Sequence, residues 1–191
     1  MTSIGSYAFD GTVWYNNQPE GLVYIGKVAY KYKGTMPKNT VIDLEEGTLG
    51  IAGDAFYNCS GLTFITIPNS VTSIGYYAFS QCPSLTELVS LASIPPVCNA
   101  GVFENVDKSL CTLKVPKGSK DAYSQADGWK DFVDNIEEVD VTGIEAVTAE
   151  GVSNADITDI YDLNGRHRDA LQPGVNIVKM SDGTTRKVIK R

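Results

Sequence analysis

Apolar residues return along this chain in a fixed phrase. The phrase reads I-x-x-x-A-F-x-x-C at 51–59 and again at 74–82, and its first six positions also occur at 4–9. The four fixed positions of the copy at 51–59 (Ile51, Ala55, Phe56 and Cys59) recur 23 residues later, and Leu62 recurs as Leu85. A period of this length predicts stacked repeats, because one such unit is too small to bury its own apolar side.

A second pattern lies between the phrases and predicts one short strand in each repeat. It reads L-x-x-I-x-I at 62–67, with a close copy at 110–115 and weaker copies near 41–47 and 85–90. Alternation predicts that Ile65 points into the core while Phe64 points outward. We therefore expect a β-rich leucine-rich-repeat solenoid with repeats of about 23 residues. Its strands should place four apolar residues in one sheet: Ile42, Ile65, Leu88 and Leu113.

Two segments of the repeat region depart from the period. Alternating runs on both sides of Gly26 predict a β-hairpin, which makes about 11–40 an insert in an enlarged repeat. At about 117–140 the sequence predicts a cap that begins with a short helix after Ser119, a residue suited to the N-cap. Trp129 and Phe132 should fold over the last repeat and close its apolar end.

The C-terminal part of the chain has a different pattern and charge. Alternating runs at 157–163, 175–180 and 185–189, separated by Asn-Gly and Asp-Gly dipeptides, predict a small antiparallel, sandwich-like β domain. Residues 1–164 hold nine Lys and Arg against 21 Asp and Glu, whereas 165–191 hold seven against two. We therefore expect two domains, 1–140 and 141–191.

Two resemblances follow from these motifs. The repeats, ending in TLKVPKGSKDAY and a later GW, resemble the BspA-like leucine-rich repeats of bacterial surface proteins over about 2–139. The closing IYDLNGR and L-x-P-G-V-N-I-V-x-M-x-D-G-x-T-x-K-V resemble the C-terminal sorting domain of type IX secretion substrates in Bacteroidetes over about 141–191. Together, the two resemblances imply a right-handed coil and a secreted or surface-attached protein that acts in adhesion or protein binding. The C-terminal domain would then serve sorting or attachment.

The sequence offers little catalytic or metal chemistry. His167 is the single histidine, and no C-x-x-C pair occurs. Consecutive acids such as those at 45–46 and 137–138 point to opposite faces of a strand, so neither pair converges on one bond. The net charge of −7 argues against nucleic-acid binding. We therefore expect a protein that is not an enzyme and has no catalytic residue, metal or cofactor.

The four cysteines allow two interpretations. Cys59 and Cys82 hold the same place in successive repeats, which favours burial as small core residues. Cys98 and Cys111 flank one repeat, and in an oxidising compartment they could form a disulfide. Spacing alone does not choose between this disulfide and free thiols.

Surface recognition remains as the expected function, in two forms. The favoured form is binding of a host or bacterial surface protein through the outward residues of the sheet, with Thr63, Thr86 and Thr112 beside four candidates: Phe64, Thr66, Glu87 and Lys114. The alternative is a glycan-binding module that uses the aromatic residues of the insert: Trp14, Tyr15, Tyr24, Tyr30 and Tyr32. The alternative assumes that these rings are exposed, although half of them could pack the hairpin onto the coil.

The start of the sequence carries its own expectation. No run is long enough for a membrane-spanning helix, and residues 1–10 lack the basic start and apolar stretch of a signal peptide. The chain opens within a repeat phrase, so the coil of residues 4–9 should expose its apolar side.

Overall fold

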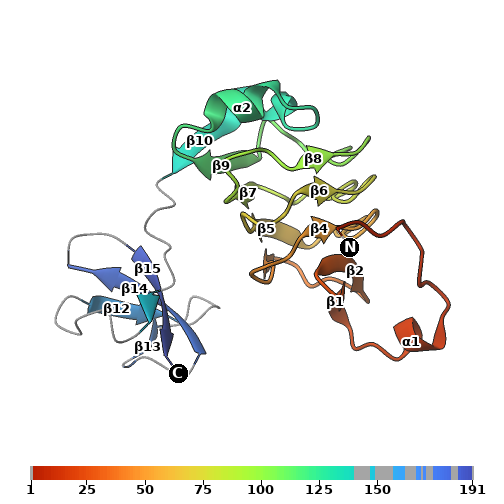
Figure 1. Ribbon diagram of the computed structural model, residues 1–191, viewed down its shortest axis with the longest axis horizontal. Coiled ribbons are helices and arrows are strands. Elements are labelled where there is room, and N and C mark those ends of the chain that lie inside the picture. The colour runs from red at the N-terminus through yellow and green to blue at the C-terminus, as the bar shows by residue number, and fades with distance from the viewer. Residues whose placement is uncertain are drawn as a thin grey trace. The chain divides into compact units, whose positions relative to one another are not determined.

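The computed structural model describes residues 2–139, 147–148, 157–161, 167–168, 170, 174–181 and 185–190 (Figure 1). The chain divides into two compact units, Met1–Val139 and Asp140–Arg191. The boundary lies one residue before the one expected from the sequence. The first unit holds the repeats and the second holds the C-terminal strands.

The first unit contains two five-stranded sheets. The first, here called the repeat sheet, is parallel throughout and has the order β10-β9-β7-β5-β3. Its strands are β3 (Thr40–Asp43), β5 (Leu62–Ile67), β7 (Glu87–Ser90), β9 (Thr112–Pro116) and β10 (Ile136–Val139). The second, the hairpin sheet, has the order β1-β2-β4-β6-β8. Its strands are β1 (Gly21–Ile25), β2 (Val28–Lys33), β4 (Gly50–Ile51), β6 (Ser73–Ile74) and β8 (Val97–Cys98).

The register of the repeat sheet confirms the predicted apolar row. Neighbouring strands pair in one line that runs through five residues: Ile42, Ile65, Leu88, Leu113 and Ile136. The three central members are fully buried, so each strand buries its inward side against its neighbours. The β-rich leucine-rich-repeat expectation is confirmed to this extent, and the handedness of the coil stays a prediction.

The repeated phrase forms the turn that follows β4 and β6, and a variant of it follows β8. Phe56 and Phe79 stack with ring centroids 5.2 Å apart, and Phe79 stacks on Phe103 at 5.5 Å. The Phe56 amide donates to the Ala78 carbonyl at 2.8 Å, and the Phe79 amide donates to the Val102 carbonyl at 2.9 Å. The phenylalanine of each phrase thus joins one repeat to the next through both its ring and its backbone.

The insert contains an antiparallel hairpin. β1 and β2 pair around a turn in which Gly26 has a φ of +60°, a conformation that glycine adopts without strain. Val28 and Ala29 of β2 then pair in parallel with β4, so the hairpin extends the sheet beyond the repeats. The short helix α1 (Val13–Asn16) precedes it.

The N-terminal phrase does not form the exposed coil expected from the sequence. Residues 2–9 keep the local turn, with Tyr7 at a φ of +61°, but they add no strand to either sheet. The hairpin occupies the place beside β4, and Ile4 and Phe9 instead pack on a second apolar cluster. That cluster consists of Tyr15, Val23, Val28, Tyr30 and Ala52.

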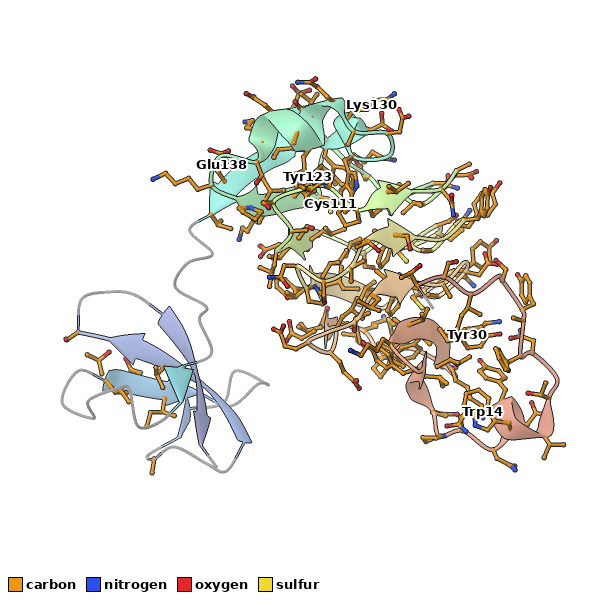
Figure 2. All side chains as sticks on the ribbon, viewed as in Figure 1. Trp14, Tyr30, Cys111, Tyr123, Lys130 and Glu138 are labelled. Carbon is orange, nitrogen blue, oxygen red and sulfur yellow. The ribbon has the colours of Figure 1, made fainter. Side chains whose placement is uncertain are left out.

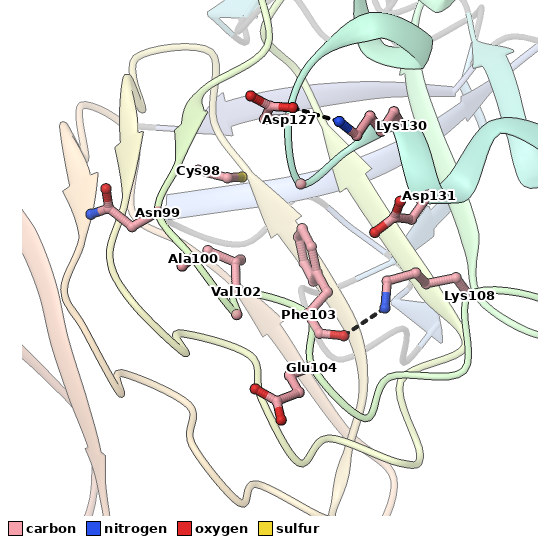
Figure 3. A pocket seen from close by; sticks show the side chains of 12 residues that line it. Cys98, Asn99, Ala100, Val102, Phe103, Glu104, Lys108, Asp127, Lys130 and Asp131 are labelled. Atoms are coloured by element: carbon pink, nitrogen blue, oxygen red, sulfur yellow. Dashed lines mark hydrogen bonds and ion pairs between the residues drawn. The ribbon is translucent and has the colours of Figure 1, made fainter.

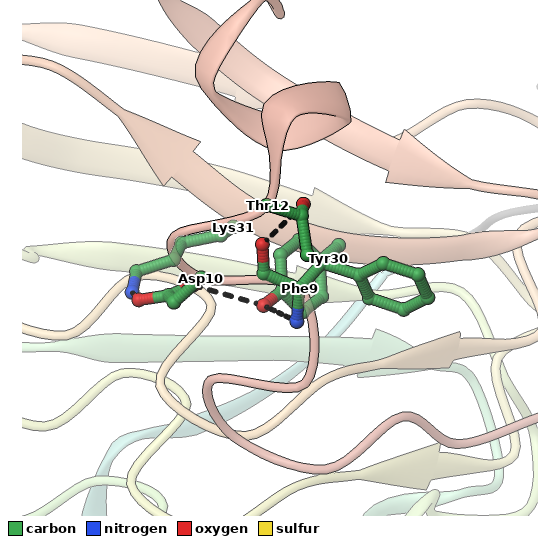
Figure 4. A network of polar contacts seen from close by, with 5 residues as sticks. All are labelled: Phe9, Asp10, Thr12, Tyr30 and Lys31. Carbon is green, nitrogen blue, oxygen red and sulfur yellow. Dashed lines mark hydrogen bonds and ion pairs between the residues drawn. The ribbon is translucent and has the colours of Figure 1, made fainter.

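A polar network fixes this N-terminal segment to the hairpin (Figure 4). The Tyr30 hydroxyl accepts from the Phe9 amide and donates to Asp10 Oδ1, both at 2.9 Å. Asp10 Oδ2 also pairs with Lys31 Nζ at 2.6 Å. Burial raises the pKa of Tyr30 to about 12, so its hydroxyl stays protonated as a donor at neutral pH.

The cap closes the last repeat, and Ser119 is the N-cap residue of its helix, as predicted, although its side chain makes no capping bond. Trp129 and Phe132 are buried with their rings 5.2 and 5.1 Å from Phe103. Helix α2 (Lys120–Gln125) receives no side-chain hydrogen bond from Ser119. Instead Glu138 Oε1, on β10, accepts from the amides of Gly118 at 2.9 Å and Lys120 at 3.0 Å. A carboxylate at a helix N-terminus stabilises it, which gives this glutamate a structural role.

The described strands of the second unit form one sheet with the order β11-β15-β14-β12-β13. They are β11 (Val147–Thr148), β12 (Ile157–Tyr161), β13 (His167–Arg168), β14 (Gly174–Met180) and β15 (Thr185–Lys190). The pairings are antiparallel except for β11 with β15, which corrects the wholly antiparallel prediction. A sandwich would need a second sheet, whereas the described residues of this unit form a single sheet. The predicted turns at 164–165 and 182–183 lie outside the described residues.

Candidate functional site

The outward side of the repeat sheet, here called the outer face, carries all four candidates for partner binding. Phe64 lies opposite Glu87 on the neighbouring strand. Thr66 lies opposite Val89, which in turn lies opposite Lys114. Because residues in register on one side of a parallel sheet share a face, these side chains form a continuous surface across β5, β7 and β9.

The outer face combines an apolar end with a charge pair. Val41, opposite Phe64, is 56% exposed, whereas Phe64 itself is half-buried. Lys114 Nζ lies 2.9 Å from Glu87 Oε2, with side chains 29% and 32% exposed. The pair neutralises the centre of the face, so that a partner would meet apolar surface and a matched pair of charges.

Two threonines beside this face form hydrogen bonds to the backbone of the preceding repeat. Thr63 Oγ1 donates to the Thr40 carbonyl at 3.1 Å, and Thr86 Oγ1 donates to the Thr63 carbonyl at 3.2 Å. Each hydroxyl therefore bridges to the preceding repeat. Both hydroxyl hydrogens are used within the repeats, and contact of Thr63 and Thr86 with a ligand stays a prediction.

The aromatic residues of the insert do not form one exposed patch. Figure 2 labels Trp14 and Tyr30 in this region, and they differ sharply: Trp14 is 43% exposed and Tyr30 only 1%. Tyr15 is buried and meets Tyr30 edge to face, with centroids 5.7 Å apart. Tyr24 is half-buried, with its hydroxyl accepting from the Glu45 amide at 2.9 Å, and Tyr32 packs against the main core.

All four cysteines carry free thiols. Cys98 and Cys111 are not linked in the structure: Cys111 is fully buried, and Cys98 is half-buried beside the cap (Figure 3). Cys59 and Cys82 are buried as predicted, and Cys82 Sγ donates to the Phe56 carbonyl at 3.1 Å. Burial raises the pKa of each thiol to about 12, which makes all four poor nucleophiles.

No metal or membrane site emerges from the part of the chain that the structure describes. Within it, no three His, Cys, Asp or Glu residues gather closely enough to hold a metal ion. No helix in the same residues is long and apolar enough to cross a membrane. His167 lies on β13 opposite Tyr161 of β12.

Sequence reasoning missed two hollows that are lined by described residues of the first unit. One, of about 470 Å³, lies beside the cap (Figure 3), where Asp127 pairs with Lys130 at 2.7 Å and Lys108 Nζ donates to the Phe103 carbonyl at 2.8 Å. The other, of about 600 Å³, is here called the tyrosine hollow. Its main lining residues are Tyr7, Tyr57, Tyr76, Tyr77, Asp54 and Glu104.

The family of the chain follows from its repeats. The model of the BspA type leucine-rich repeat region matches residues 1–108 in six copies. No curated protein matches the chain. The matched segment covers more than half of the 191 residues and contains strands β1 to β8 and the phrase turns. The chain therefore belongs to the BspA type leucine-rich repeat family.

Proposed function

We propose that this protein is a non-enzymatic, secreted or cell-surface module that binds a protein partner through the outer face. The observation that carries the proposal is the parallel register that aligns Phe64, Glu87 and Lys114 on one surface. Membership of a repeat family associated with protein binding and adhesion supports it. Stacked repeats use such extended surfaces for recognition.

The composition of the outer face fits a protein partner. The half-buried ring of Phe64, beside the exposed Val41, supplies an apolar anchor. The pair of Lys114 and Glu87 lies where a bound surface would remove it from water. Desolvated charges favour a complementary partner and penalise others, so this pair would contribute specificity more than affinity.

The test of the outer face uses immobilised extracellular matrix proteins as a panel. For any panel member that binds, Phe64→Ala and Lys114→Ala are each expected to weaken binding by about tenfold or more, as at interface anchors. The matched control is Trp14→Ala, which removes an exposed ring elsewhere and should leave binding unchanged. Binding that survives both face variants contradicts the proposal.

The glycan-binding alternative has weaker support. Of its five aromatic residues, Trp14 is the one with a large exposed area, and Tyr15 and Tyr30 are buried. A glycan array read with Trp14→Ala and Tyr24→Ala decides this alternative. Loss of a glycan signal in both variants, with no effect of Phe64→Ala, would favour glycan binding by the insert.

We further propose that residues 141–191 act in sorting or attachment, as their resemblance to type IX secretion domains implies. The excess of seven Lys and Arg over two Asp and Glu in 165–191 supports recognition by acidic machinery. Truncation after Asp140, expressed with an export signal in a Bacteroidetes host, should leave a repeat unit that melts cooperatively but is lost from the cell surface. Unchanged surface display of the folded, truncated protein would contradict the sorting role.

A further inference from the structure

We propose that the tyrosine hollow binds a cationic side chain, an arginine in a basic segment of a partner protein. The hollow is built from the turns that follow strands of the hairpin sheet, and it shares no residue with the outer face. The inference therefore adds a second binding site to the proposed function.

The repeat phrase creates this hollow by placing the same turn side by side. Tyr7, Asp54 and Tyr77 hold one position of three copies of the phrase, each with left-handed backbone at a φ of 61°, 55° and 55°. Left-handed backbone is costly for a residue with a side chain, and such strain is common at ligand-binding sites. The phrase thus brings tyrosines from separate repeats to one hollow.

The wall formed by Tyr77 is fixed by its neighbour. A Cβ added at Gly101 would lie 2.3 Å from an edge carbon of the Tyr77 ring, so this ring rests directly on the glycine backbone. Any other residue at Gly101 would push the ring away. A glycine at this place lets the hollow keep a defined shape.

The hollow exposes an unusual amount of aromatic surface. Tyr7, Tyr57, Tyr76 and Tyr77 are 59%, 49%, 55% and 42% exposed and all line the same space. Large apolar rings gathered at one exposed place mark a binding site more often than chance. The negative face of a phenol ring attracts cations in particular.

A buried carboxylate without a partner points to the charge of the ligand. Asp54 is only 9% exposed, yet its side chain forms no hydrogen bond or ion pair with any described residue. A carboxylate with so little exposed surface and no donor is a place where an entering cationic group gains a charged hydrogen-bond acceptor. Glu104 adds a second carboxylate to the lining, and no lysine or arginine lines the hollow.

The chain itself shows that one of these rings accepts a cation. Lys31 Nζ lies 4.6 Å from the centroid of the Tyr7 ring, within the range of a cation–π contact. The cap hollow provides the contrast, because its Asp127 is exposed and already has Lys130 as partner. Of these two hollows, only the tyrosine hollow is lined by a buried acid without a donor among the described residues.

An arginine suits this arrangement better than a neutral ligand. Its planar guanidinium stacks on aromatic rings and donates two parallel hydrogen bonds to a carboxylate such as that of Asp54. The net charge of −7 also attracts a basic segment before contact. A neutral sugar could stack on the same rings, but it gains nothing from the two carboxylates as charges.

The test compares an acetylated, amidated tri-arginine peptide with the same peptide made of citrulline, which is neutral and nearly isosteric. Titration calorimetry on the full chain should show binding of the arginine peptide and at least tenfold weaker binding of the citrulline peptide. Asp54→Asn should weaken arginine binding by at least tenfold, and asparagine tolerates the left-handed backbone at this position. Asp127→Asn, in the cap hollow, is the matched control and should leave binding unchanged.

A second variant guards against loss of fold. Tyr77→Gly removes a wall of the hollow and suits the positive φ, so the protein should melt as cooperatively as the unmodified chain while binding falls. Phe64→Ala should leave arginine binding intact, which separates this site from the outer face. Equal binding of both peptides, no binding of either, or binding of neutral oligosaccharides that is insensitive to Asp54→Asn would overturn the proposal.

Discussion

Replacing Phe79 with alanine is expected to lower the free energy of unfolding by about 3–5 kcal/mol, the range for large aromatic residues in cores. Phe79 is fully buried, and its ring stacks on Phe56 at 5.2 Å and on Phe103 at 5.5 Å. Alanine would leave a cavity between these two rings, and the fixed backbone bonds between repeats would prevent its collapse. Denaturant unfolding, followed by circular dichroism, measures the change.

The matched control is Phe64→Ala, which removes an identical ring from the outer face. Phe64 is half-buried and has no stacked ring partner among the described residues, so we expect a loss of less than about 1.5 kcal/mol. Equal losses in the two variants would show that the ring stack does not hold the repeats together. The comparison separates the role of the phrase from that of phenylalanine in general.

The repeat sheet was predictable because its determinants are local. Strand alternation places Ile65 inward, and the period of 23 residues places Leu88 next to it, so the register follows from counting. The same counting missed the copy that contains Phe103. There the spacing from Phe79 is 24 residues, and Val102 and Val106 replace the alanine and cysteine of the phrase. The stacked ring identifies this copy in the structure.

Features that depend on competition between segments were not predictable. The N-terminal phrase keeps its own turn, but strand β2 of the hairpin pairs with β4 in its place. No local sequence pattern predicts which of the two segments pairs with β4. Glu138 caps helix α2 from a strand 18 residues after Lys120, beyond the reach of an N-cap rule based on neighbours. Ser119 satisfied that rule and is nonetheless without a capping bond.

In the candidate site, too, features set by local pattern were predictable and features set by distant segments were not. Alternation along the strands was enough to place Phe64, Glu87 and Lys114 on one face, although it did not reveal the pairing of the two charges. The tyrosine hollow escaped prediction because its residues are not neighbours in sequence. The available signal was the tyrosine before the A-F pair in two copies of the phrase, at 7 and 77.

Replacing Trp129 with alanine is expected to release the cap and lower the free energy of unfolding by about 3–5 kcal/mol. Trp129 is fully buried, and its ring lies 5.2 Å from both Phe103 and Tyr123. Its indole Nε1–H donates to the Pro96 carbonyl at 2.8 Å, so the substitution also leaves a buried acceptor without its donor.

The consequence should extend beyond stability, because Trp129 and Phe132 cover the ring of the last repeat. Exposure of Phe103 would give the repeat stack an apolar end, and such ends associate. We therefore expect Trp129→Ala to self-associate in size-exclusion chromatography with light scattering at protein concentrations where the unmodified chain does not. Val133→Ala, in the same segment but 47% exposed, is the control. It should change the free energy of unfolding by no more than about 0.5 kcal/mol and leave the measured mass unchanged. A Trp129→Ala protein with unchanged free energy of unfolding and unchanged mass in solution would contradict the prediction. The segment after α2 would then lie on the last repeat without protecting its apolar end.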